Sequence, residues 1–285
     1  MVDIPARQLP IYAFEFLAAT TGLGVWWRFQ FSRSTAALRT TRLRTWNISA
    51  TTFLLLCVQV IAGGVIGGVL FEVTLSALPK ALQPDVDFHL MLTNLGLHLG
   101  VFAGVLISHR YTRDQPFDLT AEPSPPVHAP LSTKDAVGAG ILTFLAALPL
   151  VWIVSFTWQA TLEACGIATE KQDLLDLFGK THDPAKLTLM IAMASILAPL
   201  TEELTFRAGF FRYLRSRLPR FWAYVLPAAA FALLHWNLSV FVPLFTLGLL
   251  FSLVYQRTGR ILVTMIAHGL FNLNTVIVVL AGVTT

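Results

Sequence analysis

The sequence predicts an all-α polytopic membrane protein with about eight transmembrane helices in one bundle. Of its 285 residues 55% are hydrophobic and only 13% are charged, and the mean hydropathy is +0.66. Such values are typical of a chain whose solvent is a bilayer, not of a soluble core of the same length. Apolar runs close to the roughly 20 residues needed to cross hydrocarbon recur along the whole chain.

Eight such runs mark the predicted spans, at about 11–27, 51–77, 89–108, 137–157, 186–211, 221–238, 240–256 and 261–283. In hydrocarbon a backbone must satisfy its polar groups internally, so each span is either a helix or a strand of a closed barrel. Barrel strands are shorter, at about 9–11 residues, and alternate in polarity. Runs of this length and apolarity therefore predict helices.

The Lys and Arg residues predict how the spans are oriented. With the amino terminus outside, the inner loops receive fourteen of the 20 Lys and Arg residues and the outer segments receive five. This asymmetry predicts that both ends of the chain lie outside. Basic inner loops also account for the pI of about 9.3, so no nucleic-acid partner is indicated. The compact loops favour a multi-pass protein of a bacterial inner membrane.

Composition divides the chain into three predicted regions. Residues 1–110 form a membrane region of three helices, residues 111–136 form a Pro-rich inner linker, and residues 137–285 form a five-helix core. In the first region, the run AGGVIGGV has small-xxx-small spacing, which favours close helix packing within the chain over dimerisation. The outer segment 158–185 is expected to include a short helix on the membrane surface. No oligomeric state is indicated.

Polar residues inside the predicted spans are the candidates for function. A carboxylate or guanidinium at membrane depth costs about 2.5–3.5 kcal/mol on insertion scales, so such residues usually face a bundle interior. Glu203 and Arg207 stand four residues apart with the acid first, which favours an ion pair on one helical face. Glu202 is rotated by about 100° from Glu203 and is therefore free to act as a general base.

Two later spans carry polar groups at the same spacing. The sequence FALLH places Phe231 and His235 on one helical face, and HGLFN places His268 and Asn272 on one face. Together with the two glutamates, these groups on three neighbouring helices exceed what packing requires, so we expect them to line one site. His98, near Asn94 in the third predicted span, is interpreted as a residue that forms a hydrogen bond between helices.

The helical rise tests this convergence. Glu202 and His268 lie ten and eight residues from basic inner boundaries, which puts both about 12–15 Å into the bilayer. His235 lies fifteen residues from its boundary, or about 22 Å if the whole stretch is helical. Agreement would require part of that stretch, with its Pro219 and Pro227, to be unwound or tilted.

The motifs EELTFR, FALLH and HGLFN resemble the pattern EExxxR, FxxxH and HxxxN of the CPBP family of intramembrane proteases. That family contains the CAAX prenyl endopeptidases of eukaryotes and bacterial relatives linked to bacteriocin self-immunity. The resemblance spans about 186–283, within the predicted five-helix core, and no signature position departs from the pattern. The first 110 residues carry no motif that can be assigned.

The resemblance implies hydrolysis of a peptide bond inside the membrane. Glu202 with His235 would hold and deprotonate the attacking water, and His268 and Asn272 would donate hydrogen bonds to the oxyanion. The supporting residues would be Glu203, Arg207 and Phe231.

The resemblance also leaves a zinc metalloprotease open. If a metal is present, its ligands would be Glu202, His235 and His268, with water in the fourth position. The motif HExxH is absent and the three candidates come from separate helices. Water activation by a glutamate without bound metal is therefore the preferred interpretation.

The expected partner is a membrane-associated peptide or protein substrate within the lipid bilayer, and the sequence does not indicate whether it is prenylated. The alternative is a catalytically silent membrane scaffold or immunity protein that binds a partner. A third hypothesis is a small transporter that uses Glu202 and Glu203 as proton sites. A binder has no need of two histidines and an asparagine around a carboxylate, which favours the enzyme.

Overall fold

The computed structural model describes residues 5, 8–31, 41–44, 46, 48–113, 131–168, 178, 181 and 183–282, and every regular element in them is helical. Its elements are α1 (Leu9–Phe31), α2 (Ala50–Ser76), η3 (Lys80–Leu82), α3 (Val86–Arg113), α4 (Thr133–Ala164), α6 (Pro184–Ala192), η4 (Met193–Leu197), α7 (Ala198–Glu203), η5 (Leu204–Phe211), α8 (Arg212–Arg215), α9 (Arg220–Leu233), α10 (Leu238–Thr258) and α11 (Ile261–Leu280). The all-α fold class is thereby confirmed.

Seven of the described helices are long and apolar enough to cross a membrane, counting Pro184–Arg215 as one continuous helix. The sixth predicted span, at 221–238, corresponds to α9, which has 14 residues and rises about 21 Å, less than the roughly 30 Å of hydrocarbon. The protein is therefore a multi-pass integral membrane protein, and α9 is the predicted span that is too short to cross unaided.

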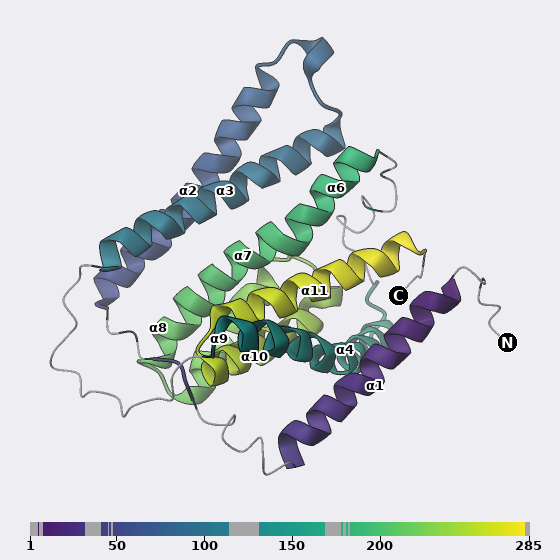
Figure 1. The fold of residues 1–285 in the computed structure, drawn as a ribbon. Coiled ribbons are helices and arrows are strands. Elements are labelled where there is room, and N and C mark those ends of the chain that lie inside the picture. The colour runs from purple at the N-terminus through teal and green to yellow at the C-terminus, as the bar shows by residue number, and fades with distance from the viewer. Residues whose placement is uncertain are drawn as a thin grey trace.

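The helices form a bundle in which the α6–α8 helix lies between the α2–α3 hairpin on one side and α11 on the other (Figure 1). The largest part of the core is formed by α4, α10 and α11, for example at Leu148, Phe251 and Ala267, all of which are almost fully buried. Ala18 of α1 packs into the same cluster. The packing therefore crosses the predicted boundary between an N-terminal region and a five-helix core, and that division stays a prediction.

Glycine contacts join α2 and α3. A Cβ atom added at Gly63 would lie 2.4 Å from the carbonyl oxygen of Gly100, and one added at Gly67 would lie 2.1 Å from that of Gly96. No side chain fits at these distances, so the two backbones touch directly. The AGGVIGGV run therefore packs within the chain, as its spacing predicts.

The start of α1 and the end of α11 lie at the same end of the bundle (Figure 1). The Gln8 side chain joins them by donating to the carbonyl of Gly282 at 2.8 Å. This agrees with the two ends of the chain lying on one side of the membrane, and the side itself stays a prediction. Most of the predicted linker 111–136 and of the outer surface helix lies outside the described residues.

The two ends of α4 offer a test of the orientation, because Lys134 is exposed in its first turn and Cys165 is exposed just after its end. We expect an impermeant maleimide to label Cys165 from outside intact cells. In a Lys134→Cys variant that also carries Cys57→Ala and Cys165→Ala, labelling should require permeabilised membranes. The reverse pattern would overturn the orientation that the basic loops predict.

The glycine interface predicts that the effect of a Gly→Ala substitution on stability depends on its position. Gly100→Ala would place a Cβ 1.9 Å from the carbonyl oxygen of Gly63, and we expect it to destabilise the protein by about 1–3 kcal/mol, as overpacking does. Gly24→Ala and Gly138→Ala are matched controls, because a Cβ at either site meets nothing within 4 Å. These should be neutral or stabilising by up to about 1 kcal/mol. Thermal unfolding in detergent measures the difference, and equal midpoints would contradict direct backbone contact.

Candidate active site

The two glutamates of the first motif lie in a helix whose backbone is irregular. The six-residue α7 is flanked by two π-helical segments, η4 and η5. Such wide turns are rare and frequently occur at functional sites. Glu202 and Glu203 are the last residues of α7, and helical rotation sends them in different directions. The side chain of Glu203 is 0% exposed and that of Glu202 is 25% exposed.

A buried ion pair joins Glu203 to Arg207 across one helical turn. Nη1 of Arg207 lies 3.0 Å from Oε1 of Glu203, and the guanidinium is as deeply buried as the carboxylate. The guanidinium carbon lies 4.4 Å from the ring centre of Phe231 and 5.5 Å from that of Phe251. Two aromatic faces and one carboxylate thus compensate the Arg207 charge where water is excluded.

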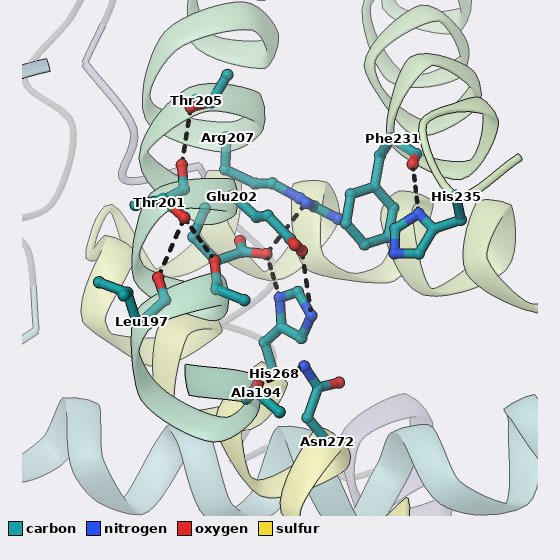
Figure 2. Close-up of polar contacts among 12 residues, drawn as sticks. Ala194, Leu197, Thr201, Glu202, Thr205, Arg207, Phe231, His235, His268 and Asn272 are labelled. Carbon is teal, nitrogen blue, oxygen red and sulfur yellow. Dashed lines mark hydrogen bonds and ion pairs between the residues drawn. The ribbon is translucent and has the colours of Figure 1, made fainter. Parts of the chain in front are cut away.

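His268 lies between the two glutamates. Its Nδ1 is 3.0 Å from Oε1 of Glu203 and its Nε2 is 3.6 Å from Oε2 of Glu202 (Figure 2). Because Glu203 pairs with Arg207 as a carboxylate, it accepts the Nδ1–H of His268, and this fixes the ring orientation. A separation of 3.6 Å is too long for a direct hydrogen bond. Nε2 of His268 and the Glu202 carboxylate therefore face each other without forming a direct hydrogen bond.

Asn272 follows His268 by one turn on α11. Its side-chain nitrogen donates to the carbonyl of Ala194 in the π-helical segment η4, at 2.8 Å. An asparagine amide has two hydrogens, so one remains for another acceptor. In Figure 2 the amide lies beside the His268 ring, on the same side of the cluster.

His235 is placed differently from the other motif residues. Its Nδ1 donates to the carbonyl of Phe231 at 3.0 Å, since a carbonyl can only accept. The Phe231 ring lies 5.1 Å from the His235 ring and 5.8 Å from the His268 ring. The Phe231 ring therefore contacts both histidine rings (Figure 2).

The prolines do not unwind the helix that leads to His235. Pro219 precedes the first residue of α9, where a missing N–H costs nothing, and the helix continues through Pro227 to Leu233. His235 lies in the turn that follows the helix end. Of the two alternatives, unwinding at the prolines is therefore wrong, and a tilt of the helix stays a prediction.

Sequence reasoning missed one contact of the cluster. His98 of α3 lies with Nδ1 2.7 Å from Oγ1 of Thr201, the residue before Glu202. It does bond between helices, as interpreted, but its partner is part of the site. A histidine inside a span was the signal available, and no spacing rule relates residues 103 positions apart.

The three residues that the zinc alternative requires are not arranged as zinc ligands in this structure. A catalytic zinc ion needs three protein ligands at about 2.0–2.2 Å each, so Glu202, His235 and His268 would have to converge on one point. Across the described ranges, no three His, Cys, Asp or Glu residues are grouped so as to hold a metal ion. The His235 ring instead packs edge-to-face against the Phe231 ring, at 5.1 Å between ring centres.

Removing one member of the buried pair should lower the free energy of unfolding far more than breaking an exposed pair does. Arg207→Met leaves the Glu203 carboxylate buried and uncompensated, and we expect it to lower the free energy of unfolding by about 3–5 kcal/mol. Adding Glu203→Gln should recover part of that loss because the stranded charge is gone. Lys186→Met, which breaks the exposed pair with Asp85, is the control and should cost about 0–1 kcal/mol. Similar unfolding midpoints for the two single variants would contradict a desolvated pair.

Comparison with known proteins finds similarity over the segment that holds this cluster. Residues 184–274 match the family model described as type II CAAX prenyl endopeptidase Rce1-like. The Bacillus subtilis protein named "Putative membrane peptidase YdiL" is 29% identical over 155 residues, which cover 53% of this chain and 61% of that relative. The chain thus spans about three fifths of the relative's length, and no solved structure matches it significantly. These matches support the resemblance carried by the three motifs, because residues 184–274, which contain all three, are similar to the Rce1-like CAAX prenyl endopeptidases.

Proposed function

We propose that this protein is an intramembrane endopeptidase in which Glu202 activates water to hydrolyse a peptide bond of a membrane-associated protein or peptide. The observation that carries the proposal is the contrast between the two adjacent glutamates: one is closed off in an ion pair, and the other is partly open beside a histidine. The Rce1-like match supports endopeptidase activity in general.

Only Glu202 is suited to act as the base. Oε1 of Glu203 is already shared by Arg207 and His268, and the side chain is sealed from solvent. A general base must come within hydrogen-bond reach of the water whose proton it takes. Glu202 keeps a carboxylate that water can reach, and its orientation is supported by the neighbouring buried charges.

The proton can be followed through the cluster. As the water oxygen attacks the peptide carbonyl, Glu202 accepts a proton, which must later reach the amine that leaves when the C–N bond breaks. His268 can relay it, because its Nδ1–H is held by Glu203 and its Nε2 faces Glu202. Carrying that proton, Nε2 can donate to the oxyanion, beside the uncommitted amide hydrogen of Asn272. One such donor is typically worth about 2.7–4 kcal/mol.

His235 is proposed as the second group that holds the attacking water. With Nδ1–H on the Phe231 carbonyl, its Nε2 carries the lone pair and can accept a hydrogen bond from that water. Because no three ligating side chains are grouped for a metal ion among the described residues, we propose a glutamate-dependent reaction without a resident metal.

Glu202→Gln separates the enzyme from a silent scaffold, because it keeps size and hydrogen-bonding shape but cannot accept a proton. We expect proteolysis of a membrane peptide by the purified protein to fall by about 10²–10⁴-fold, the usual cost of losing a general base, with insertion and thermal unfolding unchanged. Glu163→Gln, the same change at an exposed position on α4, is the matched control. Asn272→Ala should leave residual activity, because it removes one oxyanion donor.

Full activity of Glu202→Gln would mean that no proton is moved at this position. In that case the cluster would serve packing or the binding of a partner protein, and the scaffold hypothesis would replace the enzyme.

A further inference from the structure

One hydrogen bond reaches the candidate site from outside the family-matched segment. His98 lies in the middle of α3, and its Nδ1 approaches Oγ1 of Thr201 to 2.7 Å. Thr201 is 2% exposed and directly precedes Glu202 in α7. The match covers residues 184–274 and therefore includes Thr201 but not His98.

The contact has a defined direction. The Thr201 hydroxyl has one hydrogen, and its oxygen lies 3.0 Å from the carbonyl of Ala198 and 3.1 Å from that of Leu197. Carbonyls only accept, so the hydroxyl donates to its own helix, as threonine does in helices. The oxygen lone pair then accepts the Nδ1–H of His98. The imidazole is thereby held as the tautomer with hydrogen on Nδ1.

The two ends of the α2–α3 hairpin are fastened to the α6–α8 helix by other contacts. At one end Phe53 stacks on Tyr213 with ring centres 3.6 Å apart. At the other end Asp85 pairs with Lys186, and Met91 packs in the same cluster as Met190. His98 is between these ends, at the level of Glu202, so its contact is the one that bears on the site.

The backbone at Thr201 is sensitive to such a contact. Its turn lies between two π-helical segments, where the regular pattern of helical hydrogen bonds is interrupted. Thr201 binds two carbonyls of that junction through its hydroxyl, and its own carbonyl accepts from Thr205 at 2.7 Å (Figure 2). The hydrogen bond from His98 orients the hydroxyl at the centre of this arrangement.

We propose that His98 is a positioning residue of the active site, which holds Thr201 and thereby the neighbouring Glu202 in register with His268. The inference rests on the proposed function and extends it: the α2–α3 hairpin is part of the catalytic unit, not an accessory anchor. His98 touches no reacting atom in this role. A misplacement near 1 Å caused by a change away from the chemistry can cost about 10²-fold in rate.

Two replacements of His98 separate the hydrogen bond from the bulk of the ring. Asparagine carries an N–H donor close to the place of Nδ1, whereas leucine fills similar space and donates nothing. We expect His98→Leu to lower kcat by about 10- to 100-fold with KM changed less than about twofold. His98→Asn should stay within about threefold of the parent protein. A role confined to stability would not produce this split between kcat and KM.

A double-mutant cycle tests the partner. Thr201→Val removes the hydroxyl with little change in shape and should lower kcat as much as His98→Leu does. The double variant should be no worse than either single variant, because both remove the same interaction. His89→Leu is the control on the same helix: it breaks the exposed contact with Glu72 and should leave kcat unchanged.

Thermal unfolding of each variant accompanies the kinetics. The inference is overturned if His98→Asn is as impaired as His98→Leu, if the two losses in the cycle add, or if kcat falls only as the folded fraction falls. If His98→Leu does not fold, the kcat values of Thr201→Val and His98→Asn test the inference by themselves. A parental kcat in His98→Leu, beside an inactive Glu202→Gln, refutes this inference and leaves the proposed function standing. An active Glu202→Gln refutes the proposed function first.

Discussion

The buried ion pair between Glu203 and Arg207 is the interaction on which the rest of the site depends. Each charge loses several kcal/mol of solvation on burial, and only close geometry with further partners compensates that loss. The partners come from separate helices: His268 from α11, Phe231 from α9 and Phe251 from α10. We attribute to the pair a role in specifying how these helices meet, more than a gain in stability.

The pair also explains how two adjacent residues of one type can have different tasks. Glu203 turns toward Arg207 and becomes a fixed part of the framework, whereas the side chain of Glu202, the residue before it, stays 25% exposed. His268 connects the two, with one ring nitrogen on the framework and the other toward the reacting group. Separate environments for neighbouring acids are a recurring way to assign acid–base roles.

The helices outside the family-matched segment contribute more than a membrane anchor. The glycine faces of α2 and α3 bring their backbones into direct contact, so the two helices pack as one hairpin unit. That unit places His98 on Thr201, and α1 packs against the core around α4. The site is therefore assembled by the whole bundle, although its motifs are confined to the second half of the chain.

Hydropathy and length located the seven long apolar helices among the described residues, because burial in lipid is a requirement that each span meets alone. The pairing of Glu203 with Arg207 followed from helix geometry, and counting along helices placed Glu202 near His268, where the two side chains lie 3.6 Å apart. Counting could not show that α9 stays regular through Pro227 or that the Phe231 ring packs against both His235 and His268. Nor could it show the contact of His98 with Thr201, 103 positions away. Contacts within one helix depend on spacing alone, whereas contacts between helices depend on how the whole bundle packs.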